Sequence, residues 1–235
     1  NVERYIPTGS GIAYRYISHP FWTLPASGLG VVVTGTAGAW EAVGPAATPT
    51  NNLFRYDETK NTETWYPAEN APGMVGWVSL DNASTLSVPG RGYALRSNGG
   101  VTLSMSGAVV PTSAVVTVSA SRTAGSPDPS TDGMNLVGNP YTAPLSWPSL
   151  YAIAGNSSFG TVCYRFVNDG PYTGTYYSVD DFGIVSPAAG PADIALGQGF
   201  FVQRLAGTGE FSFDNTAIAA TNPAFHKTSG TPSHL

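Results

Sequence analysis

Histidine, cysteine and carboxylate side chains do most of the acid, base and nucleophile chemistry in proteins, and here they are few and scattered. The histidines and the cysteine are His19, His226, His234 and Cys163. None of them belongs to a Gly-x-Ser-x-Gly nucleophile motif or a His-Glu-x-x-His zinc motif. His19 precedes Pro20-Phe21, which predicts a turn-capping side chain. Cys163 lies in an alternating, strand-like run, which predicts a buried thiol. The sequence therefore nominates no catalytic residue, and we expect a protein without enzymatic activity.

Carboxylates in loops are the usual protein ligands of Ca²⁺, and two segments of this chain carry them. Asp128 and Asp132 lie in the loop-like segment 128–133, and Asp180 is followed directly by Asp181. Hard cations bind several oxygens at once, but neither segment has the spacing of an EF-hand loop. We interpret both segments as solvated turns and expect neither a metal ion nor another cofactor.

Aromatic side chains are the remaining candidates for a binding site. The chain has 5 Trp, 12 Tyr and 10 Phe. Exposed rings on a β-sandwich can stack on sugars, and Trp65, Tyr66 and Trp77 flank predicted turns, so they are the candidates for glycan stacking. The alternative is that the rings fill the core, because aromatic side chains bury large areas. A carbohydrate-binding module that binds extracellular glycans is therefore one of the two functions we consider.

The composition limits which elements can position these side chains. Of 235 residues, 28 are Gly and 19 are Pro, 42% are hydrophobic and only 11% are charged. Such a chain is neither a coiled coil, nor a helical bundle, nor a charge-driven disordered tail. The net charge of −5 offers no basic stripe, so we expect no nucleic-acid partner. No apolar run approaches the roughly 18 residues that cross a bilayer, so we expect no membrane insertion.

Short β-branched and aromatic runs recur between Gly, Pro, Asn and Ser, which predicts an all-β fold, an antiparallel β-sandwich or jelly roll. A short helical turn is predicted near residues 146–154. The predicted strands are 11–17, 30–36, 53–57, 76–80, 92–96, 101–106, 114–119, 135–137, 161–167, 175–179, 199–204 and 210–213.

Three weak internal matches occur in the same order along the chain and predict a duplication. The matching segments are 18–21 with 138–141, 54–57 with 164–167, and 89–96 with 196–203. We therefore expect two similar halves of one sandwich, or two tandem β domains. The predicted division is a first β unit at 1–120, a linker or long loop at 121–133, a second β unit at 134–216 and a tail at 217–235. In both units we expect the Gly-x-Gly sequence to permit a bulge or a close backbone approach.

Six blocks, in order over residues 1–215, resemble the ectodomains of secreted Bacteroidota surface proteins of the type exported by type IX secretion. They are Val-Glu-Arg-Tyr-Ile-Pro at 2–7, Tyr-Arg-Tyr-Ile-Ser at 14–18, Leu-Phe-Arg-Tyr-Asp at 53–57, Gly-Arg-Gly-Tyr at 90–93, Asn-Leu-Val-Gly-Asn-Pro-Tyr at 135–141 and Gly-Gln-Gly-Phe-Phe-Val at 197–202. The resemblance implies an extracellular or cell-surface β-sandwich module and no activity. Such proteins usually end in a sorting domain, and 217–235 is too short and polar to be one, so we expect that domain to be cleaved or absent.

The surface composition favours self-association. Lysine, which commonly blocks sheet edges in β proteins, occurs only twice. We therefore expect a non-catalytic structural or adhesive surface protein whose copies associate head-to-tail into a fibre or sheath. The residues predicted to contact the next subunit lie near the two ends of the chain: Val2, Arg4, Tyr5, Ile6, Ile218 and Phe225.

Overall fold

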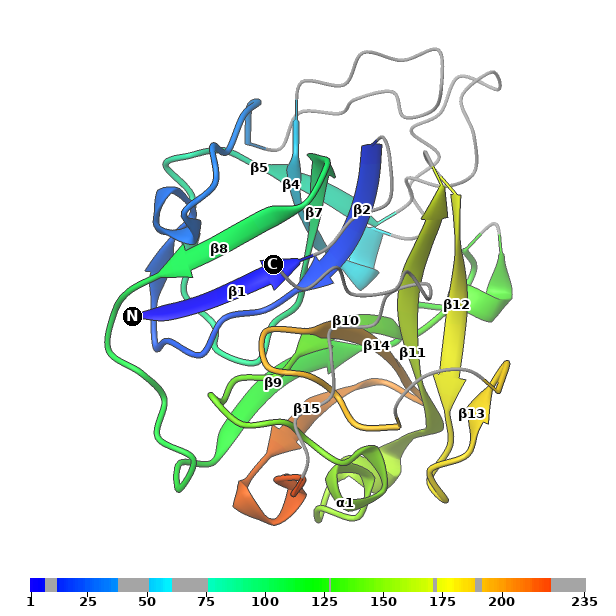
Figure 1. Cartoon of the computed structure of the whole chain (residues 1–235). Coiled ribbons are helices and arrows are strands. Elements are labelled where there is room, and N and C mark those ends of the chain that lie inside the picture. Colours follow the sequence, from blue (N-terminus) through cyan, green and yellow to red (C-terminus); the bar gives the residue numbers. More distant parts are fainter. Residues whose placement is uncertain are drawn as a thin grey trace.

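The computed structural model describes residues 1–6, 12–37, 51–60, 76–126, 128–170, 173–188 and 192–220. This part of the chain has an all-β, sandwich-like fold of antiparallel strands, as the composition predicted (Figure 1). Its one α-helix is the short α1 (Trp147–Tyr151), inside the predicted helical turn, and no described helix is long and apolar enough to cross a membrane. The 3-10 turns are η1 (Ala26–Leu29), η2 (Glu58–Lys60), η3 (Pro129–Thr131), η4 (Asn156–Ser158) and η5 (Asn215–Ala217).

The first repeat is one four-stranded sheet covered on one face by a two-stranded pair. Its strands are β1 (Val2–Ile6), β2 (Ile12–Ile17), β3 (Leu24–Pro25), β4 (Leu53–Tyr56), β5 (Trp77–Leu80), β6 (Thr85–Leu86), β7 (Tyr93–Asn98) and β8 (Val101–Met105). The sheet has the order β2-β7-β4-β5, and β1 pairs with β8. Alternation along the strands sends Ile17, Leu53 and Leu95 toward Ile6 and Leu103, and together they form an apolar core.

The second repeat has the same plan. Its strands are β9 (Val116–Ser121), β10 (Met134–Gly138), β11 (Phe159–Gly170), β12 (Thr173–Val179), β13 (Val185–Ser186), β14 (Gly199–Arg204) and β15 (Thr208–Phe213). The sheet has the order β10-β14-β11-β12-β13, and β9 pairs with β15. Phe200 and Val202 of this sheet meet Phe211 and Phe213 of the pair, while Trp147 of α1 closes the core.

The strand pairing confirms two similar halves. Every main pair of the first repeat has a counterpart: β1–β8 matches β9–β15, β2–β7 matches β10–β14, and β4 pairs with β5 and β7 as β11 does with β12 and β14. The three sequence matches lie on equivalent elements. Because β9 pairs with β15, the strands divide into repeats between β8 and β9, and the predicted boundary at residue 120 falls inside β9. The predicted boundary assigned β9 to the first unit because β9 follows β8 closely in the sequence, whereas its pairing partner β15 belongs to the second repeat.

The two repeats pack face to face through an aromatic layer and through reciprocal backbone contacts. Tyr16 and Tyr56 of the first repeat pack against Phe201 of the second, with ring centroids 5.3 and 5.1 Å apart. An isolated bridge joins Ile17 to Gln198, and its counterpart joins Arg91 to Val137. Equivalent residues thus make equivalent contacts in both directions, as in a two-fold interface.

The Gly-x-Gly sequences serve this contact. A Cβ on Gly92 would lie 2.5 Å from the carbonyl oxygen of Val137, and a Cβ on Gly199 would lie 3.0 Å from that of Ile17. Both glycines therefore allow one repeat's backbone to approach the other's, as predicted.

Gly92→Ala is therefore expected to lower the free energy of unfolding by about 1–3 kcal/mol, because the added methyl group forces the backbones apart. Gly160→Ala is the matched control: its Cβ would meet Gln203 at an ordinary 3.7 Å, so little change is expected. Chemical denaturation of the two variants measures the difference. Equal stability would contradict the tight contact at Gly92.

One predicted strand, 30–36, does not form. Asn side chains take the place of a neighbouring strand there. Asn52 Oδ1 accepts a hydrogen bond from the Thr34 N–H at 2.9 Å, and Asn51 Oδ1 accepts one from the Thr36 N–H at 2.7 Å. The backbone is satisfied without a ladder, so an apolar run typical of a strand remains irregular.

Candidate interaction surface

His19 is part of the fold's framework. Its ring is buried, and its Nδ1 accepts a 3.4 Å hydrogen bond from the Phe21 N–H. At the equivalent position of the second repeat, Asn139 Oδ1 accepts a 2.9 Å bond from the Tyr141 N–H. The predicted turn-capping role is confirmed. Burial lowers the pKa of His19 to about 4, so the ring is neutral at physiological pH.

The thiol of Cys163 is likewise buried and unreactive. It is fully buried in the core of the second repeat, as predicted. Burial raises its pKa to about 12, so the nucleophilic thiolate does not form near neutral pH.

The loop carboxylates act as caps. Asp128 Oδ1 accepts from the Ser130 N–H at 3.0 Å and caps η3. Hydrogen bonds from Ser126 hold the pKa of the Asp132 carboxyl below its usual range. Asp180 Oδ1 accepts from two backbone N–H groups of its own turn. Within the described ranges, no three His, Cys, Asp or Glu side chains are grouped so that they could hold a metal ion.

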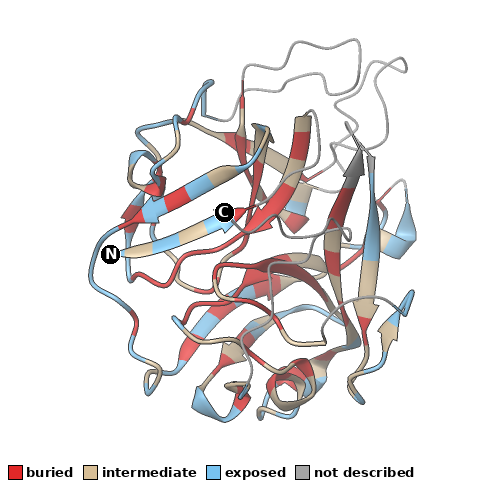
Figure 2. Ribbon diagram, viewed as in Figure 1, coloured by how far each residue is buried: buried red, intermediate tan, exposed pale blue. Residues whose placement is uncertain are grey.

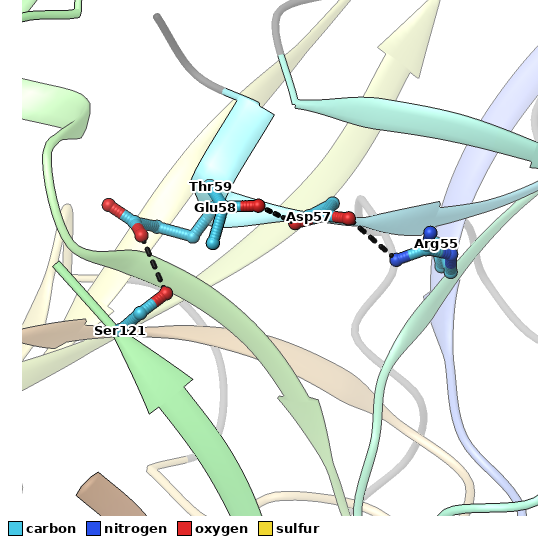
Figure 3. A network of polar contacts seen from close by, with 5 residues as sticks. All are labelled: Arg55, Asp57, Glu58, Thr59 and Ser121. Atoms are coloured by element: carbon cyan, nitrogen blue, oxygen red, sulfur yellow. Dashed lines mark hydrogen bonds and ion pairs between the residues drawn. The ribbon is translucent and has the colours of Figure 1, made fainter. Parts of the chain in front are cut away.

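Glu58 makes a buried polar contact that was not predicted from the sequence. It is buried, and its carboxylate crosses from the first repeat to the segment that follows β9. It accepts hydrogen bonds from Ser121 Oγ at 2.7 Å, the Thr123 N–H at 2.5 Å and the Gly133 N–H at 3.0 Å. Figure 3 shows Glu58 pointing to Ser121, while its neighbour Asp57 turns the other way. The segment 121–133, predicted as a linker or loop, is therefore anchored to the first repeat.

Of the three residues predicted to stack on glycans, Trp65 and Tyr66 lie outside the described residues. Trp77 lies on β5 and is half-buried. Its ring packs in the aromatic layer against Tyr56, Tyr16 and Phe201, at centroid distances of 5.1, 5.7 and 6.0 Å. This placement matches the alternative that the rings fill the interior.

Most of the residues predicted to contact another subunit instead pack against other parts of the same chain. On β1, which pairs with β8, Ile6 is fully buried in the first core and Val2 packs against that core. Arg4 is half-buried, whereas Tyr5 is 62% exposed. Ile218 is half-buried against the second core and bridges Leu145. Phe225 lies outside the described residues. Among the members of this set that the structure describes, Tyr5 is the one exposed large apolar side chain.

Two sheet edges in the second repeat are blocked by asparagine side chains. Asn135 accepts from the Ser121 N–H at 3.1 Å and donates to the Ser121 carbonyl at 2.9 Å, at the end of β9. Asn156 does the same for Ser212 of β15, with both distances 2.8 Å. An amide thus replaces a neighbouring strand at each point. The scarcity of lysine therefore does not leave these two positions open.

An uncharged strip runs along one side of the molecule across both repeats. Residues 97–121, which run from the end of β7 through β8 and the connection to the end of β9, contain no Asp, Glu, Lys or Arg. Figure 1 shows the connection descending on the left, and Figure 2 shows much of it exposed. Val109 and Val115 are exposed here. Trp22 lies beside the strip, because its backbone N–H donates a hydrogen bond to the Ala108 carbonyl at 3.1 Å.

The equivalent position in the second repeat shows which residue this turn holds when Trp22 is absent. The turn at 18–21 matches 138–141, so the residue equivalent to Trp22 is the exposed Thr142. The fold therefore accepts a small polar residue at this position, yet Trp22 presents a ring that is 45% exposed. Trp22 is not among the residues predicted from the sequence to form a contact, although extending the internal match by one residue would have found it.

A comparison of the chain with protein-family models, with curated protein sequences and with solved structures found no match.

Proposed function

We propose that this protein is a non-catalytic structural or adhesive module of the cell exterior that works by associating with copies of itself. The observation that carries the proposal is Trp22 on the uncharged strip, where the equivalent position shows that folding needs no large ring. The order of the six sequence blocks across both repeats supports the extracellular setting.

The strip is physically suited to contact another protein. Interface centres are depleted in charge and enriched in aromatic residues, and a Trp at such a centre often contributes more than 2 kcal/mol. Trp22 lies beside Val109 through the Phe21–Val109 bridge, Val115 is exposed further along the connection, and β8 and β9 on either side carry exposed Thr and Ser side chains. The strip itself has no charges, and the charged side chains directly opposite it are Glu3, across from Ser104, and Glu210, across from Ser119.

Replacing Trp22 by the residue of the other repeat tests the proposal. Trp22→Thr is expected to weaken self-association by about tenfold or more, because the ring is lost from the centre of the contact. Sedimentation velocity over a series of concentrations measures the change. Thermal unfolding should be little altered, because Thr142 occupies the equivalent turn.

Val32→Thr is the matched control, since Val32 is also exposed but lies outside the strip. It is expected to associate like the wild type. A wild-type protein that stays monomeric at all concentrations would overturn the proposal. If Trp22→Thr and Val32→Thr had equal effects on association, the strip would not be the contact surface.

A further inference from the structure

A tight turn between β12 and β13 holds two large apolar side chains in solvent. Phe182 is 83% exposed and Ile184 is 63% exposed. The turn is fixed from within: Asp180 Oδ1 accepts from the N–H groups of both residues, at 3.0 and 2.8 Å, and Gly183 has a φ of +82°. These side chains are therefore presented on an ordered scaffold.

The equivalent turn of the first repeat shows what the fold requires. The strand registers match Leu80 with Val179, so the turn at 81–85 corresponds to 180–184. The backbone bond is also repeated: Ser84 N–H donates to the Asp81 carbonyl at 3.1 Å, and Gly183 N–H donates to the Asp180 carbonyl at 2.9 Å. The first turn exposes Ala83 and Thr85 where the second exposes Phe182 and Ile184.

The neighbouring hairpin of the second repeat also has an exposed apolar residue where the first repeat has a polar one. Leu205, after β14, is 52% exposed, whereas its equivalent is the polar Asn98, the last residue of β7. β12 and β14 both run antiparallel to β11, so the turns that follow them lie toward the same end of the sheet. Val179 and Val202, near the ends of these strands, flank Cys163 about two strand spacings, or roughly 10 Å, apart. Phe182, Ile184 and Leu205 together are called the apolar end.

The two turns of the apolar end carry opposite charges. Asp180 and Asp181 precede Phe182. Beside Leu205, Arg204 donates hydrogen bonds to the neutral carbonyl oxygens of Ala206 and Thr208 at 2.9 and 3.0 Å. An acidic apolar turn thus lies next to a basic apolar turn, and a second copy, turned by 180°, offers each turn its complement.

We propose that the apolar end binds the apolar end of a second copy, with Phe182 of one copy against Leu205 of the other. This inference rests on the proposed self-association and adds a contact distinct from the uncharged strip. Each chain then has two contact surfaces on different elements. Since repeated use of two contacts builds an open assembly, this second contact explains how copies could extend beyond a dimer.

Cysteine cross-linking tests the contact, and the buried Cys163 does not compete. Phe182→Cys protein and Leu205→Cys protein, one carrying a purification tag, are mixed under mild oxidation. The expected product on a non-reducing gel is a dimer that joins the two variants, in excess over dimers of either variant alone. The matched controls are Ala83→Cys and Asn98→Cys at the equivalent positions of the first repeat, which should not cross-link.

The outcomes separate this contact from the strip. Absence of the mixed dimer, or cross-linking of the first-repeat controls to the same extent, overturns the apolar end as a contact, even if Trp22→Thr still weakens association. A mixed dimer together with an unchanged Trp22→Thr variant supports the apolar end and overturns the strip. In the double variant Phe182→Ala/Ile184→Thr, association is expected to weaken about tenfold.

Discussion

Glu58→Ala is expected to lower the free energy of unfolding by about 2–4 kcal/mol. The carboxylate accepts from the N–H groups of Thr123 and Gly133 and from the hydroxyl of Ser121, and its side chain is buried. Alanine leaves the two backbone donors without this acceptor, and each orphaned buried donor costs about 1–3 kcal/mol. Denaturant unfolding followed by tryptophan fluorescence measures the loss.

Glu58→Gln separates the hydrogen bonds from the charge. Its carbonyl oxygen can still accept from a backbone N–H. Its amide NH2 group can donate to the hydroxyl oxygens of Ser121 and Thr123, which in the wild type donate to Glu58 Oε2 at 2.7 and 3.0 Å. We therefore expect a smaller loss than with alanine, about 1 kcal/mol. Hydrogen exchange at 121–126 should accelerate in Glu58→Ala and less in Glu58→Gln. A stable alanine variant with unchanged exchange would show that this segment is held by other contacts.

The fold could be predicted from the sequence because its signals are local. Alternating apolar residues and Gly-Pro-Asn turns define the strands, and the equivalent blocks at 89–96 and 196–203 lie on β7 and β14. Partner choice is not local. β9 follows β8 in the sequence but pairs with β15, about ninety residues later by register. Side chains that replace a strand, such as Asn135 and Asn156, likewise show no pattern in a single sequence.

The candidate surfaces were missed for a related reason. Exposure decides whether an aromatic ring is a contact or a core residue, and sequence does not report exposure for an isolated ring. Trp77 was selected because it flanks a turn, but it packs in the layer between the repeats, whereas Trp22 and Phe182 are exposed. Comparing the two repeats supplies the missing information, because Thr142 and Ala83 show that the turns form without these rings.

Stability is expected to fall by about 3 kcal/mol from His19 alone as the pH decreases from about 6.5 to about 4. In the unfolded chain His19 has an ordinary pKa near 6.5, whereas burial lowers the pKa of the folded state to about 4. Between these values the unfolded state binds more protons, so stability rises with pH. The contribution is present above pH 6.5, is lost as the pH falls, and is fully lost below about 4.

His19→Asn isolates this effect, because asparagine does not titrate in this range and Asn139 caps the equivalent turn. At pH 7.5 the variant should be slightly less stable than the wild type, since it loses the ring that stacks on Tyr93 at a centroid distance of 6.1 Å. At pH 4.5 we expect the order to reverse, because the wild type must keep its buried imidazole neutral. Denaturant unfolding of both proteins across this range measures the difference, from which the carboxylates shared by both proteins cancel. A constant difference would show that the pKa of His19 is the same in the folded and unfolded states, and would require a solvent path or an acceptor at its ring.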